Sequence, residues 1–326
     1  SHTLSSSLTN LRLDHYLYTR ESLNRAKDLL KPDGLLILSF EAARPWIGDR
    51  LASTFNQVFG SPPLTFEVRN GGTLGWGGYF FIAGKSQAVL DQALVSQPHL
   101  SQFVADHARQ FNLNSKSLTD DWPYLYLDHP RLPLIHLLIA AFLVLGLITI
   151  KTTLLKSTPI HWPMFFWGAA FLLLEFQNIS KASLLFGLTW QTNLIIITAV
   201  LLFILLANFV VAKKLITLRL AFIGLLVSIL IQLWIPLYAL NRLSFLPKLI
   251  LAGGLLNLPF LFGAIIFASW FIKSKDKSAA FASNLLGAAI GGLLEAISFL
   301  TGIKSLLVLT VMLYATGWAI YHRQAK

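Results

Sequence analysis

The 326-residue chain contains no cysteine. Disulfide bonds, thiolate nucleophiles and cysteine-ligated zinc or iron–sulfur sites are therefore excluded. The eight histidines are scattered, and none of them has the His-x-His or His-x-x-x-His spacing that is typical of a metal site. We therefore expect no metal centre in this protein.

Charged side chains are scarce as well, at 13% of residues against about 25% in an ordinary soluble protein, while hydrophobic residues reach 55%. Acidic residues nearly disappear after residue 130. From there to the end, the chain has 15 lysines and arginines but only three acidic residues, Glu175, Asp276 and Glu295. The net charge of +11 therefore belongs to the hydrophobic half, whose basic residues lie in short gaps between apolar runs. This placement favours a membrane topology and argues against a nucleic-acid partner.

The first 112 residues alternate between helical and strand patterns. Thr19 is expected to cap a helix over 19–31, and Gly60 to end a second helix over 47–60. A third amphipathic helical stretch is predicted over 86–111. Apolar runs predict strands, the first buried on both faces and the last two joined as a hairpin, at 35–40, 64–68 and 78–84.

This order of elements predicts the C-terminal half of a doubly wound α/β sheet. Residues 1–84 are too few for a complete sheet of that type, so we expect its opening strands to be missing. Residues 113–131 are rich in proline and aromatic residues and are interpreted as a linker. In this linker Trp122, Tyr124 and Tyr126 are expected to form part of an interfacial aromatic belt.

Residues 132–326 predict an all-α transmembrane domain of six to seven segments, most of which reach the roughly 20 residues that a spanning helix needs. The shortest segment, 162–177, contains Glu175 and is the candidate for a re-entrant or short helix. Gly287 and Gly291 have the Gly-x-x-x-Gly spacing that favours close helix packing. The segments lie near 132–150, 162–177, 189–212, 219–240, 248–272, 279–300 and 303–321.

Several stretches resemble a known family. “YTRESLNRAKDLLKPDGLLILSF” (18–40) resembles the fifth-strand region of spermidine-synthase-like proteins, which are relatives of the class I AdoMet-dependent methyltransferases. “DDWPYLYL” (120–127) resembles the segment that closes this domain in bacterial members fused to membrane helices. “LLLEFQNISKASLLFGLTWQTNLIIITAVLLFILLAN” (172–208) and “ASNLLGAAIGGLLEAISFLTG” (282–302) resemble the membrane module of those fusions.

The resemblance implies a transferase that uses AdoMet or decarboxylated AdoMet. In the family pattern, the glycine-rich donor loop, the acidic ribose-binding residue and the catalytic aspartate all precede residue 1 of this chain. The catalytic residue is therefore unknown here, and we expect this chain alone to bind the donor weakly or not at all. His2, Asp14, Tyr16 and Tyr18 are candidates for the substrate side of the cleft, because they precede a helix at the carboxyl edge of the sheet. Loop capping and tyrosine packing are the structural alternatives.

The basic residues also predict sidedness. If all seven segments cross, ten lysines and arginines lie on one face and four on the other. The face with ten is expected to be cytoplasmic, which places residues 1–131 outside, away from the cytoplasmic metabolite AdoMet. If 162–177 is re-entrant, six segments cross, and the α/β half shares the cytoplasm with most of the basic gaps.

Polar residues inside apolar runs form the second candidate site. Ionisable residues in a membrane usually face a bundle interior or a cavity. One interpretation is that the site lines a cavity for a cation such as a polyamine, or holds a proton. The other is that Glu175 and Glu295 are protonated, or bonded to Lys181 or to Asn and Ser side chains, and fix the helix packing. The candidate residues are Glu175, Gln177, Asn178, Asn284 and Glu295.

Three functions remain open at this stage. The first is a spermidine-synthase-like transferase, incomplete as an enzyme in this chain, which transfers an aminopropyl or methyl group. The second is a transporter, or a polyamine- or lipid-binding membrane module with a non-catalytic α/β domain. The third is a purely structural membrane protein. In each case the expected location is the bacterial inner membrane, crossed several times, with the lipid bilayer as partner.

Overall fold

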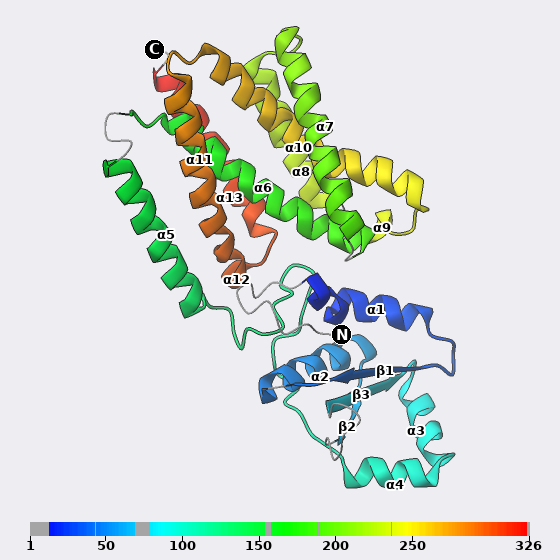
Figure 1. Ribbon diagram of the computed structural model, residues 1–326. Helices are drawn as coiled ribbons and strands as arrows, with labels where there is room; N and C mark the ends of the chain where they lie inside the picture. The colour runs from blue at the N-terminus through cyan, green and yellow to red at the C-terminus, as the bar shows by residue number, and fades with distance from the viewer. Residues whose placement is uncertain are drawn as a thin grey trace. The chain divides into compact units, whose positions relative to one another are not determined.

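The computed structural model describes residues 13–42, 44–68, 78–153, 158–187, 190–235 and 237–324 (Figure 1). The chain divides into two compact units, Ser1–Arg131 (unit 1) and Leu132–Lys326 (unit 2). The segment interpreted as a linker, 113–131, therefore belongs to unit 1. The two units are described separately below.

Unit 1 combines short helices with a small sheet (Figure 1). Thr19 caps the first helix as predicted, accepting a hydrogen bond from the backbone N–H of Ser22, and Gly60 ends α2 with a φ of 79°. The described elements are η1 (Leu13–Tyr18), α1 (Arg20–Leu29), β1 (Leu35–Phe40), α2 (Pro45–Phe59), β2 (Leu64–Val68), β3 (Gly78–Gly84), α3 (Gln87–Val95) and α4 (Pro98–Asp106).

The three predicted strands are confirmed, and the helical stretch predicted over 86–111 is helical to residue 106 but divided in two. Two helices occupy that region, α3 and α4, and the second begins with Pro98. Proline is accepted in the first turn of a helix but lacks the N–H that a helix interior requires. Pro98 therefore starts a new helix and prevents α3 from continuing.

The described strands form one sheet in the order β1-β3-β2, and β3 runs antiparallel to both of its neighbours. The predicted pairing of β2 with β3 is confirmed, with Phe66 opposite Phe80, while its loop, 69–77, lies outside the described residues. Because β1 and β2 both oppose β3, they run parallel to each other and are joined through α2. This is a β-α-β crossover with a third strand inserted between its two strands.

The prediction that β1 is buried on both faces is wrong. Helix α2 packs on one face of the sheet, where the rings of Phe55 and Phe81 stack with centroids 6.0 Å apart. Leu35 and Ile37 point to the other face and are 36% and 58% exposed. The described sheet has β1 as an edge strand, and it leaves these two apolar side chains uncovered.

Arg50 of α2 is fully buried and joins this helix to a distant segment of unit 1 by hydrogen bonds. Its guanidinium lies 5.0 Å from the ring of Trp122 and 5.4 Å from that of Trp46. Burial lowers the pKa of Arg50 to about 10, so the side chain stays charged at neutral pH. The guanidinium donates to five backbone carbonyl oxygens, those of Lys116, Tyr124, Leu125, Leu127 and Asp128.

These bonds hold residues 116–128 against α2. Trp122 and Tyr124 are consequently buried in unit 1, at 4% and 0% exposure, and their predicted place in an interfacial belt is wrong. Tyr126 is partly buried, and its ring meets the edge of His15 at 4.9 Å. The aromatic residues before the membrane half therefore close the core of unit 1.

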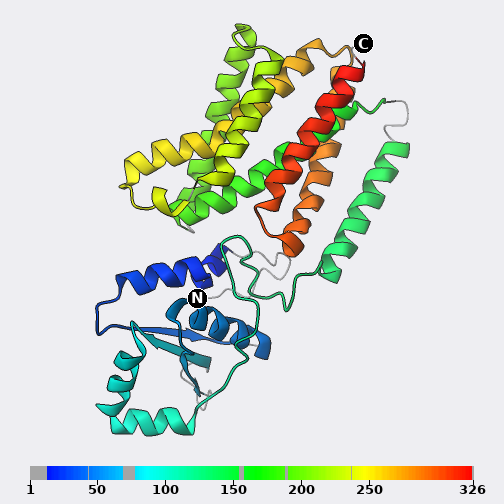
Figure 2. The same ribbon diagram turned by 180° about the vertical axis from the view of Figure 1, so that it is seen from behind.

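Unit 2 is a bundle of long apolar helices (Figures 1 and 2). Its elements are α5 (Leu134–Thr153), α6 (Trp162–Phe186), α7 (Trp190–Ala212), α8 (Leu218–Trp234), α9 (Leu237–Leu240), α10 (Phe245–Lys273), α11 (Lys277–Leu294), η2 (Glu295–Ile297), α12 (Ser298–Thr301) and α13 (Ser305–Gln324).

Five stretches of the described residues are long and apolar enough to cross a membrane. Their presence indicates an integral, multi-pass membrane protein. Helix α8 is apolar but has only 17 residues, and α6 is not among the five. The five are Leu134–Thr153, Leu194–Ala212, Phe245–Lys273, Lys277–Thr301 and Ser305–Gln324.

The short helix expected at 162–177 is wrong, while its crossing of the membrane stays a prediction. This stretch belongs to α6, one continuous helix of 25 residues that ends at Gly187 with a φ of 88°. At 1.5 Å per residue it is about 37 Å long, more than the roughly 30 Å of a hydrocarbon core. Helix α6 packs against α10, α11 and α13, which surround it in the bundle (Figures 1 and 2).

The close packing predicted for the Gly-x-x-x-Gly face is confirmed. A Cβ added to Gly287 would collide with the carbonyl oxygen of Phe165, and one added to Gly291 with that of Ala169. From the α6 side, a Cβ on Gly168 would collide with the carbonyl oxygen of Asn284. The backbones of α6 and α11 therefore touch, and only glycine fits at these three positions.

Arg50→Lys should release the segment that closes unit 1. One ammonium cannot reach five carbonyl oxygens, and each buried carbonyl left unpaired costs about 1–3 kcal/mol. We expect amide hydrogen exchange in residues 116–128 to accelerate by more than a hundredfold, measured by mass spectrometry. Arg109→Lys is the control, since Arg109 makes a surface ion pair with Glu67. Unchanged protection of 116–128 in Arg50→Lys would contradict this role.

Gly287→Ala should separate α6 from α11 and lower the stability of the bundle by about 1–3 kcal/mol, because the added methyl meets backbone atoms. Gly254→Ala in α10 is the matched control, because an added Cβ there meets nothing within 4 Å. Thermal unfolding followed by size-exclusion chromatography in detergent measures both. Equal melting temperatures for the two variants would show that the backbone contact is not required.

Candidate functional site

A group of polar side chains lies inside unit 2, around the C-terminal half of α6. Three of them belong to α6, one to α8 and one to α10. We call these residues, Gln177, Asn178, Lys181, Gln232 and Asn257, the α6 polar cluster. The three members on α6 are buried, with Lys181 the most exposed at 8%. Polar groups at such positions require partners within the bundle, because lipid offers none.

Hydrogen bonds connect this cluster across three helices. The Asn178 amide donates to Oδ1 of Asn257 on α10 at 2.7 Å, and Asn257 donates to the carbonyl of Gly253. Nζ of Lys181 donates to Oε1 of Gln232 on α8 at 3.0 Å. Gln232 in turn donates to the carbonyl of Leu256, at 2.8 Å. Helix α6 is thereby tied to α8 and α10 by side chains.

Gln177 makes the cluster's third connection. Its amide donates to the carbonyl of Ile303, in the turn before α13, at 2.6 Å. Within the described residues, three buried oxygens of α6 lack a hydrogen-bond partner: Oε1 of Gln177, Oδ1 of Asn178 and Oγ of Ser180. The cluster therefore offers one ammonium donor and several neutral acceptors, which suits a water or a small polar group.

The two intramembrane carboxylates are not part of the cluster. Glu175 and Glu295 are partly buried, and no hydrogen bond or ion pair of either carboxylate is found among the described residues. Glu295 stands where α11 ends and η2 begins, and its backbone carbonyl accepts from Ser298 at 2.6 Å. A shared cavity for the two carboxylates stays a prediction that no described contact supports.

Asn284 belongs to the helix crossing and not to the cluster. Its amide donates to the carbonyl of Met164 on α6 at 3.1 Å, beside Gly168. This bond joins α11 to α6 near the opposite end of α6 from Lys181. The structure thus gives Asn284 a packing role.

In unit 1 the structure describes two of the four cleft candidates. His2 and the side chain of Asp14 lie outside the described residues. Tyr16 and Tyr18 are each 6% exposed, and the Tyr18 ring meets the edge of Phe40 at 5.2 Å. Phe40 is the last residue of β1, so Tyr18 lies at the carboxyl end of that strand.

Lys181, Gln232 and Asn257 were not among the site residues predicted from the sequence. Each of them interrupts or flanks an apolar run, which is a signal in the sequence, but their pairing depends on how α6, α8 and α10 cross. The described residues contain no group of three or more His, Cys, Asp or Glu that could hold a metal ion.

No protein-family model, curated protein or solved structure matches this chain. The family resemblance therefore rests on the stretches quoted above.

The bond between Asn178 and Asn257 should appear as a coupling free energy. Asn178→Leu and Asn257→Leu should each destabilise the bundle, and the double variant should lose less than their sum, by about 0.6–1.7 kcal/mol. Unfolding in a detergent titration measures each variant. Gln177→Leu with Asn257→Leu is the control pair, expected to add within about 0.3–0.5 kcal/mol. If the stability losses of Asn178→Leu and Asn257→Leu simply add, the hydrogen bond between the two side chains does not stabilise the bundle.

Proposed function

We propose that this protein is a membrane-anchored transferase of the spermidine-synthase-like kind. In this proposal unit 1 is the C-terminal part of an AdoMet-type domain, and unit 2 anchors it in the bacterial inner membrane. The reaction would be aminopropyl or methyl transfer, in which an amine attacks the carbon bonded to a sulfonium. The C–S bond of the donor would break, and the amine would lose a proton to a carboxylate base that the described residues do not identify.

The observation that carries this proposal is the sheet of unit 1. Two parallel strands joined through α2, with β3 inserted antiparallel between them, are compatible with the end of a doubly wound sheet. The exposure of Ile37 and Leu35 on β1 supports the same proposal, because an apolar run on both faces is typical of an interior strand.

The position of Tyr18 supports a cleft at this sheet. Ligands of open α/β sheets bind beyond the carboxyl ends of the parallel strands. Tyr18 packs on Phe40 at that end of β1, and Tyr16 lies two residues earlier in η1. Both side chains are buried, so their proposed contribution is an apolar wall that orients a substrate.

The second candidate function is a transport or ligand-binding membrane module with a non-catalytic α/β unit. The arrangement of the helices in unit 2 favours it. Basic residues lie where α5, α7, α10 and α13 end and where α8 and α11 begin, and these ends share one side of unit 2 (Figures 1 and 2). The chain enters α5 from the other side. By the positive-inside rule, residues before α5 would then lie outside, away from AdoMet.

The α6 polar cluster limits the ligands that suit this second function. A cation such as a polyamine would need a compensating carboxylate, and the described contacts place none in the cluster. A neutral polar ligand suits these donors and acceptors better. The polyamine expectation gains no support from the described residues.

The side of the membrane on which unit 1 lies distinguishes the two proposed functions. The chain has no cysteine, so Ser96→Cys, exposed in unit 1, is a clean reporter for a membrane-impermeant maleimide. The transferase proposal expects this cysteine to be labelled only after spheroplasts are opened, because its donor is cytoplasmic. Labelling of Ser96→Cys in intact spheroplasts would reject the transferase.

Ser278→Cys, exposed at the start of α11, is the reference for the basic side of unit 2. It should be labelled from the opposite side to Ser96→Cys if α5, α6, α7, α8 and α10, the long helices between the two positions, all cross. Labelling of both positions from the same side would require one of these helices to remain on a single side.

A further inference from the structure

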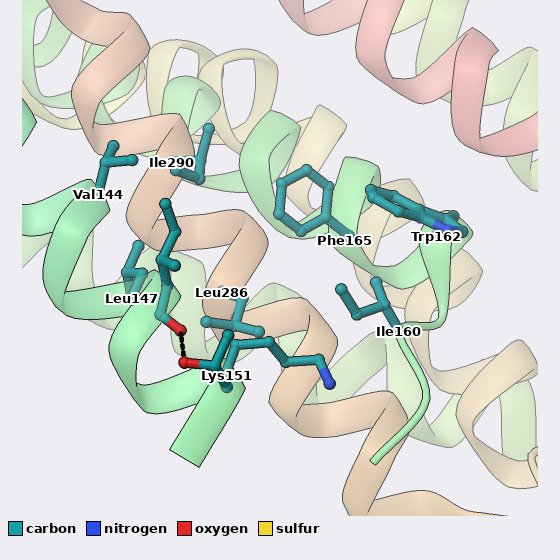
Figure 3. A pocket seen from close by; sticks show the side chains of 10 residues that line it. Val144, Leu147, Lys151, Ile160, Trp162, Phe165, Leu286 and Ile290 are labelled. Carbon is teal, nitrogen blue, oxygen red and sulfur yellow. Dashed lines mark hydrogen bonds between the residues drawn. The ribbon is translucent and has the colours of Figure 1, made fainter. Parts of the chain in front are cut away.

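Helix α5 leaves a pocket between itself and the closely packed pair α6 and α11 (Figure 3). None of the residues of α5, all of which the structure describes, is buried. The pocket has a volume of about 250 Å³ and opens along the outside of unit 2. It is lined by Val144, Leu147, Ile148, Lys151, Thr152, Ile160, Trp162, Phe165, Leu286 and Ile290.

The lining is apolar along most of the pocket's length. Leu286 and Ile290 project from α11 toward α5, and Phe165 of α6 closes the inner side (Figure 3). Leu286 and Ile290 flank Gly287, whose contact with α6 turns these larger side chains outward. An apolar space of this kind does not hold water. In a bilayer the material beside it is hydrocarbon.

One end of the pocket is basic. Lys151 lies there, with Nζ donating to the carbonyl of Thr158 at 2.9 Å. Lys273 and Lys277 lie on the same side of unit 2, where α10 ends and α11 begins (Figure 1). The carboxylate on this side, Asp276, caps α11 by accepting from Ala279 N–H at 2.8 Å. Trp162, 46% exposed, adds an aromatic side chain of the type enriched at membrane interfaces.

We propose that this pocket binds one acyl chain of an anionic phospholipid, whose phosphate lies beside Lys151. The pocket, which is open along its length and about 250 Å³ in volume, can hold part of one acyl chain but not a whole phospholipid. The basic end selects a negative headgroup, because a lysine near the membrane surface attracts anionic lipid. This site does not depend on transferase activity in unit 1.

Native mass spectrometry of the full chain, released from detergent with added lipid, tests the proposal. Phosphatidylglycerol and phosphatidylcholine with identical acyl chains are the two probes. The wild-type protein should retain phosphatidylglycerol in preference. Lys151→Gln should reduce its retention about fivefold, the effect expected of one lysine near the surface. Lys248→Gln, at the other side of unit 2, should leave retention unchanged.

Variants that fill the pocket with a larger side chain test whether the acyl chain of the lipid lies there. Leu286→Trp should abolish preferential retention, whereas Leu285→Trp, a neighbour on α11 outside the lining, should not. Val144→Trp fills the pocket from α5 and serves if Leu286→Trp does not fold. Retention that is equal for the two lipids, or unaffected by both Lys151→Gln and a pocket-filling variant, overturns the proposal.

Discussion

The organisation of this protein depends on one constraint, that a buried polar group must find its partners inside the protein. Helix α6 shows its effect most clearly. Its C-terminal half carries Gln177, Asn178 and Lys181, which lipid cannot solvate, and each donates to another part of unit 2. These bonds require neighbours around that half of α6. The glycine contacts with α11 then fix the N-terminal half, where backbone meets backbone.

The same constraint operates in unit 1. Arg50 and Lys181 are both buried basic side chains that donate hydrogen bonds to neutral oxygens, backbone carbonyls in one unit and an amide in the other. A buried donor is stable only when it is satisfied by acceptors inside the protein. Arg50 achieves this by drawing residues 116–128 around itself. The consequence is that Trp122 and Tyr124, which would otherwise suit a membrane interface, complete a core.

Local features of this fold are readable from the sequence, and non-local ones are not. The strands, the Thr19 cap, the Gly60 turn and the Gly287 face each depend on a few neighbouring residues. The extent of α6 was mispredicted because polar residues after Glu175 suggest a helix end, whereas they continue the helix toward α8 and α10. The partners Gln232 and Asn257 could not be assigned, since apolar periodicity does not specify which helices cross. The burial of Tyr124 likewise follows from Arg50, 74 positions away.

In the stretch from Ala170 to Gly187, the residues that matter for packing differ from the one that the sequence draws attention to. In the sequence Glu175 attracts attention as a carboxylate among Phe and Leu, and it suggests a cation site. In the structure the buried residues of this stretch that reach other helices are Asn178 and Lys181, whereas Glu175 makes no described hydrogen bond. The polar interior of the bundle is therefore built from amides and one amine, without a carboxylate among its described contacts. Positive charge lies instead at the end of α5 beside Lys151, on the side of unit 2 where the phosphates of lipids would lie.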